Sequence, residues 1–84
     1  MEQGSRAAIL AAIQEIVESV LGVPNLGMTE ETTAQDVDGW DSLTHVQIIV
    51  GVEQHYGIRF SFSEVAQLED AGSLIDAIIR HSGD

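Results

Sequence analysis

Apolar residues recur at steps of three and four in separate segments of the chain, and this spacing constrains the fold more than any other feature. Such a period places the apolar side chains on one face of a helix. We expect the first helix over residues 6–21, with Ser5 as its N-cap and with Gly22 and Pro24 ending it. Its buried face is predicted to carry Ile9, Ile13, Ile16 and Val20.

The second helix is expected to run from about Asp41 to Tyr56 and to end at Gly57. Its apolar residues fall into two stripes, about a third of a turn apart. The first stripe, which the first helix can bury, consists of Ile49, Val52 and Tyr56. The second stripe consists of Leu43, Val46 and Val50. This second stripe is either buried by the other helices or exposed as an apolar patch for a partner.

Two further helices complete the prediction. Residues 63–68, capped by their first serine, are expected to form a short third helix. Residues 58–62 before it are predicted to be an extended link, because the chain offers no second strand to pair with them. The last helix is predicted to begin near Ser73, whose spacing to Asp76 matches a capping box, and to fray at His81. Its inward side chains are predicted to be Leu74, Ile75, Ile78 and Ile79.

Residues 22–40 lack both the helical and the strand period and are rich in turn formers and acids. A loop of this length in a compact domain is usually functional, and we expect Leu26, Met28 and Val37 to attach it to the core. The sequence therefore predicts an all-α fold in a single domain over residues 1–84. The fold is a small four-helix bundle with a long loop between helices one and two and a short third helix.

The composition excludes several classes of function. The formal net charge is −11, from fourteen acidic residues against three arginines and no lysine. Such a chain cannot neutralise phosphates, so electrostatically driven binding to nucleic acid or to an anionic membrane surface is excluded. The acidic surface instead favours partner proteins with basic patches.

Cysteine is absent, which excludes disulfides, thiolate catalysis and zinc–thiolate sites. No apolar run reaches membrane-spanning length, and the acid before the first apolar run argues against a signal peptide. We therefore expect a cytoplasmic monomer without membrane insertion.

The strongest candidate for chemistry is GWDSL, residues 39–43. Asp41, Ser42 and His45 could be compared with a catalytic triad. A triad also needs an oxyanion hole and a cleft, and its serine normally lies on a strained turn, so a hydrolase is not predicted. We expect His45 to be a partly buried or solvated polar residue, and Trp40 to be a hydrophobic staple or core plug.

A metal site is not predicted either. A calcium loop with Gly39 at its sixth position would place Ala34 first and His45 twelfth, where carboxylates are required. The spacing of His45, His55 and His81 does not match a metal site. Weak, nonspecific binding of divalent cations remains open for Asp36, Asp38 and Asp41.

Ser42 has two interpretations. Serine or aspartate at the start of a helix caps free backbone N–H groups. A hydroxyl there is also well placed to carry a phosphate, because the helix dipole and the unpaired amides favour an anion. The neighbouring Asp41 opposes an anion slightly, which makes better sense if it holds a cation or magnesium of a modifying enzyme.

Residues 39–43, followed by Val46 and an amphipathic helix, resemble the acyl carrier protein and peptidyl carrier protein superfamily. The resemblance covers nearly the whole chain. It implies that a phosphopantetheinyl transferase attaches 4′-phosphopantetheine from coenzyme A to Ser42, and that Asp41 assists this modification. The thiol of the arm would then hold an acyl or aminoacyl group as a thioester, so the protein itself is expected to be a carrier and not an enzyme.

The resemblance also implies a partner-binding surface made of Leu43, Val46, Val50 and Glu53. Expected partners are the transferase, an acyl-loading ligase or acyltransferase, and downstream acyl-using enzymes. The sequence departs from the family at Trp40, where a smaller residue is common, and at Asp38, which looks like an insertion. Gln47 and Gln54 stand where carriers of primary fatty-acid synthesis often have glutamate, which favours a specialised, freestanding carrier.

One alternative remains from the pattern alone. The chain could be an unmodified helical interaction module, in which Ser42 is only a cap and the stripe of Leu43, Val46 and Val50 binds a partner helix.

Overall fold

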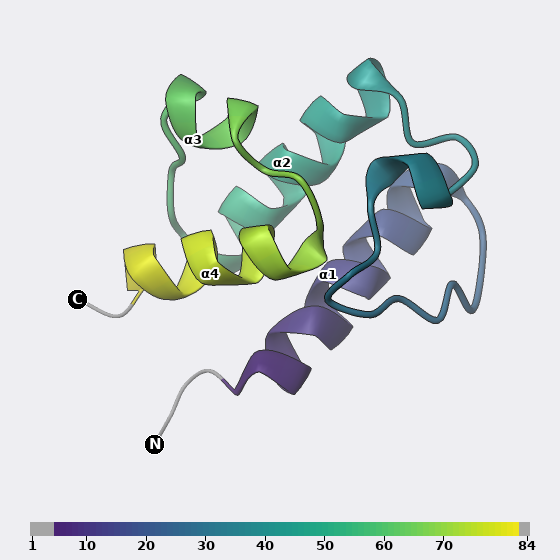
Figure 1. Ribbon diagram of the computed structural model, residues 1–84, viewed down its shortest axis with the longest axis horizontal. Coiled ribbons are helices and arrows are strands. Elements are labelled where there is room, and N and C mark those ends of the chain that lie inside the picture. The colour runs from purple at the N-terminus through teal and green to yellow at the C-terminus, as the bar shows by residue number, and fades with distance from the viewer. Residues whose placement is uncertain (1–4, 83–84) are drawn as a thin grey trace.

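The computed structural model describes residues 5–82, and all regular structure in this part of the chain is helical. Figure 1 shows α1, α2 and α4 gathered around one centre, with the small α3 beyond α2 and α4. This confirms the predicted all-α bundle with a long first connection and a short third helix. The elements are α1 (Arg6–Leu21), the 3₁₀ turn η1 (Ala34–Asp36), α2 (Ser42–Tyr56), α3 (Phe62–Ala66) and α4 (Ala71–Ser82).

The two long helices begin and end where the sequence predicts. Ser5 caps α1, because its hydroxyl accepts a hydrogen bond from the backbone N–H of Ala8 at 3.1 Å. Gly22 and Gly57 end α1 and α2 in the left-handed conformation, with φ of 72° and 66°. A residue with a side chain is strained at such angles, so glycine suits both positions.

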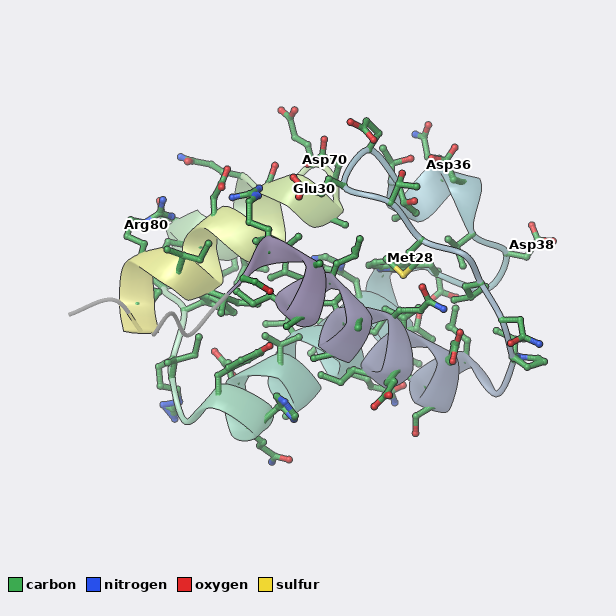
Figure 2. The ribbon with its side chains drawn as sticks, turned by 90° about the horizontal axis from the view of Figure 1, so that it is seen from below. Met28, Glu30, Asp36, Asp38, Asp70 and Arg80 are labelled. Carbon is green, nitrogen blue, oxygen red and sulfur yellow. The ribbon has the colours of Figure 1, made fainter. Side chains whose placement is uncertain are left out.

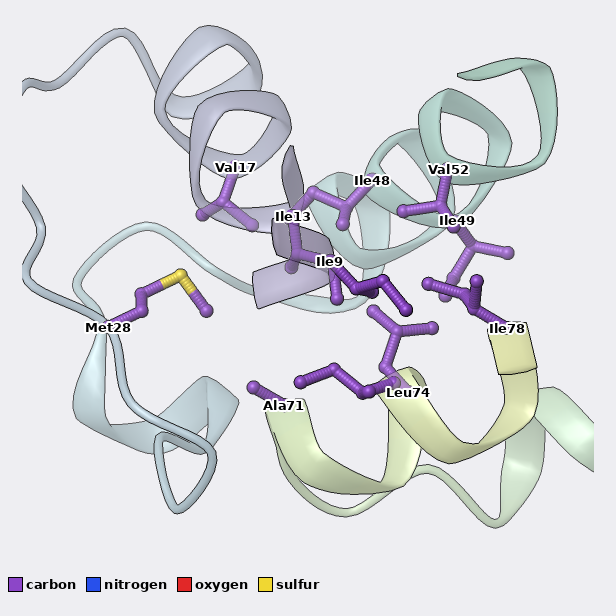
Figure 3. Packing of buried hydrophobic residues seen from close by; sticks show 11 residues of the cluster. Ile9, Ile13, Val17, Met28, Ile48, Ile49, Val52, Ala71, Leu74 and Ile78 are labelled. Carbon is purple, nitrogen blue, oxygen red and sulfur yellow. The ribbon is translucent and has the colours of Figure 1, made fainter. Parts of the chain in front are cut away.

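The core lies between α1, α2 and α4, with one methionine added from the loop (Figure 3). Ile13, Val17, Ile48 and Val52 have no exposed surface in this core. Val17 and Ile48 were missing from the predicted stripes, whereas Ile16 and Val20 are only partly buried. The buried face of each helix is therefore rotated slightly from the prediction. The buried cluster comprises Ile9, Ile13, Val17, Met28, Ile48, Ile49, Val52, Ala71, Leu74, Ile75 and Ile78.

The long loop is attached to the bundle as predicted. Met28 and Val37 are buried and Leu26 packs against the core; Figure 2 shows Met28 directed into the bundle, while Asp36 and Asp38 point outward. Polar contacts add to this attachment. The guanidinium of Arg6 donates to Glu30 at 2.8 Å and to Asp76 at 2.7 Å, which joins α1, the loop and α4.

The predicted boundaries of α3 are wrong. Its N-cap is Ser61, not Ser63, and the helix ends at Ala66 rather than at residue 68. The reason is a capping box: the Ser61 hydroxyl accepts from the N–H of Glu64 at 3.1 Å, while the Glu64 carboxylate accepts from the N–H of Ser61 at 2.8 Å. Phe62 therefore belongs to the helix and not to the extended link.

The predicted start of α4 is also wrong. The helix begins at Ala71, and Asp70 accepts hydrogen bonds from the N–H and the hydroxyl of Ser73 at 2.8 and 2.9 Å. Asp76 does not form a capping box with Ser73, since it pairs with Arg6 instead.

The C-terminal end of α4 differs from the prediction as well. Ile79 is 37% exposed rather than inward, and the unpredicted Ala77 is buried in its place. His81 does not mark a fraying end, because its Nε2 lies 2.9 Å from a carboxylate oxygen of Glu64 and its ring packs edge-on against Phe60. In the described residues, no helix is long and apolar enough to cross a membrane.

Candidate functional site

Asp41 is the residue that caps helix α2. Its backbone is extended, with φ −116° and ψ −168°, and its Oδ1 accepts hydrogen bonds from the N–H of Leu43 at 3.1 Å and of Thr44 at 3.0 Å. These bonds satisfy two of the amides that the first turn of a helix leaves without a partner. The hydrogen bond from the backbone N–H of Thr44 lowers the pKa of Asp41, so this carboxylate is ionised at neutral pH.

Thr44 completes the cap from the other side. Its hydroxyl oxygen accepts from the N–H of Asp41 at 2.8 Å and donates to the carbonyl of Gly39 at 2.8 Å. Gly39 has φ 89°, a conformation that favours glycine, so the chain turns sharply just before the helix. The sequence analysis missed Thr44, although its spacing of three residues from Asp41 was a readable capping signal.

Ser42, the first residue of α2, is left without a structural role by this arrangement. Its side chain is exposed, and within residues 5–82 its hydroxyl has no hydrogen-bond partner. The interpretation of Ser42 as a cap is therefore wrong, because the cap is Asp41. A free, exposed hydroxyl beside a helix N-terminus can be modified without breaking any contact of the fold.

Trp40 and His45 flank Ser42 and contact each other. The indole Nε1 of Trp40 donates to Nδ1 of His45 at 3.1 Å, and the rings stack with centroids 6.1 Å apart. Because Nδ1 is the acceptor, neutral His45 carries its proton on Nε2. Burial lowers the pKa of His45, which favours this neutral form. Trp40 packs against the core, as predicted for a core plug.

The second apolar stripe of α2 is exposed rather than buried. Leu43, Val46 and Val50 are 67%, 56% and 43% exposed. Phe62 at the start of α3 is 89% exposed, and the sequence analysis did not assign it a function. The one feature of the sequence that could have placed Phe62 in a helix is the capping box formed by Ser61 and Glu64. The second stripe of α2 is therefore not part of the core.

Glu53, the remaining predicted site residue, already forms a hydrogen bond within the fold. Its carboxylate accepts a hydrogen bond from the N–H of Phe60 at 2.8 Å, which ties the end of α2 to the link before α3. Over residues 5–82, no group of three or more histidine or acidic side chains is arranged to hold a metal ion. The structure does not support a catalytic triad. Nδ1 of His45 accepts a hydrogen bond from Trp40, and within residues 5–82 no hydrogen bond joins the His45 ring to Ser42.

The sequence model of a family described as "phosphopantetheine attachment site" matches residues 11–78, which include the whole site. The chain belongs to this phosphopantetheine-binding family. Members of the family carry their cargo on the prosthetic group and leave catalysis to other proteins, so the carrier is not an enzyme. The prosthetic group of the family is 4′-phosphopantetheine.

Relatives and a solved structure agree with the assignment. The carrier is 32% identical to the acyl carrier protein of Acidothermus cellulolyticus, over 88% of each chain. It is 34% identical to the meromycolate extension acyl carrier protein of Mycobacterium leprae, over 83% of this chain and 61% of that one. The solution structure of the holo acyl carrier protein of Geobacter metallireducens superposes with a TM-score of 0.82 at 36% identity, over 89% of this chain and 86% of that one.

Proposed function

We propose that this chain is an acyl carrier whose 4′-phosphopantetheine arm is attached to the hydroxyl of Ser42. The observation that carries the proposal is the division of roles at the start of α2. Asp41 caps the helix, whereas the Ser42 hydroxyl is exposed and has no partner within residues 5–82. Of the residues in the GWDSL segment, only Ser42 offers a nucleophilic oxygen that the fold does not use.

The residues around Ser42 fit such an arm. In the modification, the Ser42 oxygen forms a bond to the phosphorus next to the pantetheine of coenzyme A. The pyrophosphate bond breaks, adenosine 3′,5′-bisphosphate leaves, and the serine proton is released. The ionised Asp41 stands next to the hydroxyl, where it can bind a magnesium ion or a basic group of the transferase. Once attached, the arm supplies the thiol that the chain lacks.

The exposed apolar residues of α2 support a docking role for partner enzymes. Leu43, Val46 and Val50 follow Ser42 along one side of the helix and are exposed. Phe62 adds a further exposed aromatic ring from α3. With a net charge of −11 around them, these residues suit partners with an apolar contact surface surrounded by basic side chains. We include Asp41 and Glu53 as acidic contacts in this surface.

The partners we propose are a phosphopantetheinyl transferase, an acyl-loading ligase or acyltransferase, and enzymes that use the acyl group. We further propose that residues 1–84 form one carrier domain, monomeric and cytoplasmic, that serves a specialised pathway. Gln47 and Gln54 support specialisation, since both are exposed on α2 at positions where carriers of primary fatty-acid synthesis often have glutamate. Growth rescue of a strain that lacks its fatty-acid carrier would contradict it.

Intact-mass measurement tests the central proposal. The purified protein is incubated with coenzyme A, magnesium and a promiscuous phosphopantetheinyl transferase. We expect the mass to rise by one phosphopantetheine, and we expect Ser42→Ala to stay unmodified. The exposed Ser63 provides the matched control, so Ser63→Ala should still be modified. If the wild-type mass does not change, the chain is an interaction module of the same shape.

A further inference from the structure

The hydroxyl of Thr44 binds the backbone on both sides of Trp40. It accepts a hydrogen bond from the N–H of Asp41 and donates one to the carbonyl of Gly39, both at 2.8 Å. The hydroxyl has a single proton, and the two oxygens of Asp41 that could also accept it lie farther away, at 3.2 and 3.3 Å. One side chain in the first turn of α2 therefore holds the segment that leads into the helix.

Other bonds hold the same segment, but none of them replaces this one. The N–H of Trp40 donates to the carbonyl of Val37 at 3.2 Å, and its indole donates to His45 at 3.1 Å. The N–H of Asp41 is bonded to Thr44 alone within residues 5–82. Loss of the hydroxyl would therefore free the backbone of Asp41 on the side that faces away from the helix.

The fold uses only one of the two carboxylate oxygens of Asp41. Oδ1 accepts from the amides of Leu43 and Thr44 at 3.1 and 3.0 Å. Oδ2 forms no hydrogen bond or ion pair in the described part of the chain, and Asp41 is exposed beside the exposed Ser42. With Oδ1 fixed by the helix and the backbone fixed by Thr44, the free oxygen keeps a constant direction relative to the serine.

We propose that Thr44 is a positioning residue for the modification of Ser42. Its hydroxyl holds the backbone of Asp41, so that the free carboxylate oxygen meets the cation of the transferase at a fixed place beside the serine hydroxyl. The inference rests on the proposed attachment of the arm to Ser42. It adds a residue that acts on this reaction through Asp41 without contacting the reacting atoms.

The first test compares Thr44→Val, which keeps the side-chain shape and removes the hydroxyl, with Thr44→Ser, which keeps the hydroxyl. The whole unmodified chain is incubated with coenzyme A, magnesium and a promiscuous phosphopantetheinyl transferase, and initial rates are measured by intact mass. We expect Thr44→Val to lower kcat by about tenfold and to change KM for the carrier by less than about twofold, because misplaced groups slow the chemical step. Thr44→Ser should retain most of the wild-type kcat.

A structural measurement and a matched control accompany the rates. Hydrogen exchange by NMR should be faster for the amide of Asp41 in Thr44→Val than in the wild type. The control is Thr32→Val, because the Thr32 hydroxyl also accepts from the amide three residues earlier, that of Thr29 at 2.9 Å, but lies in the long loop. This variant should keep the wild-type kcat. If circular dichroism shows that Thr44→Val does not fold, Thr44→Ala takes its place.

A double-mutant cycle shows whether Thr44 acts through the carboxylate. Asp41→Asn retains a helix cap and removes the charge. Adding Thr44→Val to Asp41→Asn should lower kcat by less than about twofold further, whereas independent effects would multiply. A role of Thr44 in general stability would lower kcat equally in both backgrounds.

Three results would overturn the inference. Thr44→Val could keep the wild-type kcat, Thr44→Ser could lose as much as Thr44→Val, or the tenfold loss could persist in the Asp41→Asn background. Intact mass separates this failure from that of the proposed function. A wild-type protein that gains the arm while the variants behave in one of these ways contradicts only the role of Thr44, whereas a wild-type protein that gains no mass contradicts both.

Discussion

At the scale of single residues, Asp41 and Ser42 have different roles at the start of α2, although either residue type can cap a helix. Asp41 accepts two amide hydrogen bonds, and the adjacent Ser42 accepts none among the described residues. We expect Asp41→Ala to lower the urea midpoint of unfolding, because it leaves the amides of Leu43 and Thr44 uncapped. Ser42→Ala should leave the midpoint unchanged.

The control for this comparison is Asp41→Asn, since asparagine caps helices about as well as aspartate. It should retain most of the stability that Asp41→Ala loses. A loss of stability in Ser42→Ala equal to that in Asp41→Ala would mean that the serine also caps the helix.

His45 gives the protein a predictable response to acid. Burial lowers its pKa below the usual 6.5, so the unfolded chain takes up a proton at this residue before the folded protein does. Stability should therefore fall as the pH drops below about 6.5, and the loss should be complete below the lowered pKa. His45→Gln retains an acceptor for Trp40 and does not titrate. Its melting temperature should fall less than that of the wild type when thermal melts at about pH 7.5 and about pH 5.5 are compared.

The residues of the site were more predictable than their roles. GWDSL at a helix start was readable, because the aspartate, serine and glycine each favour such a position. The sequence could not show whether Asp41 or Ser42 caps the helix. Both residue types are good caps, and the choice depends on the backbone angles at Asp41. The hydrogen bond from Trp40 to His45 depends on two ring orientations that no sequence spacing specifies.

At the scale of elements, α2 has one buried and one exposed apolar stripe. Ile49 is 5% exposed and Val46 is 56% exposed, so the same substitution should have opposite consequences. We expect Ile49→Glu to cost ~3 kcal/mol or more and to unfold the bundle, because it buries an unpaired charge. Val46→Glu should preserve helicity by circular dichroism and slow the modification by the transferase. Equal loss of helicity in the two variants would contradict the assignment of the stripes.

The helix boundaries were predictable where one local signal stood alone. Ser5, Gly22 and Gly57 have no competitor nearby, and α1 and α2 begin or end beside them as expected. The start of α3 was ambiguous because Ser61 and Ser63 are both capable caps, and the carboxylate of Glu64 decides for Ser61. For α4, the expected box between Ser73 and Asp76 failed because Arg6, far away in the sequence, binds Asp76.

At the scale of the whole molecule, negative charge opposes the compact state. The chain has fourteen acidic residues and three arginines, so the acidic side chains repel one another. Salt weakens this repulsion, because the Debye length is about 8 Å at an ionic strength of 0.15 M. We therefore expect the melting temperature to rise when sodium chloride is added. Magnesium chloride at the same ionic strength should give nearly the same rise, since the described residues contain no cluster that could hold a metal ion. A melting temperature indifferent to both salts would contradict this account.

The long loop also supplies hydrogen-bond acceptors to the start of α4, which follows much later in the chain. The carbonyls of Glu30 and Thr32 accept hydrogen bonds from the amides of Gly72 and Ala71, at 2.8 and 2.9 Å. The opening turn of α4 is thus completed by a strip of backbone from the first half of the sequence, which lies next to Asp70 in Figure 2. Cleavage of the loop at these residues would remove the acceptors of both amides, so the start of α4 should become more accessible to solvent.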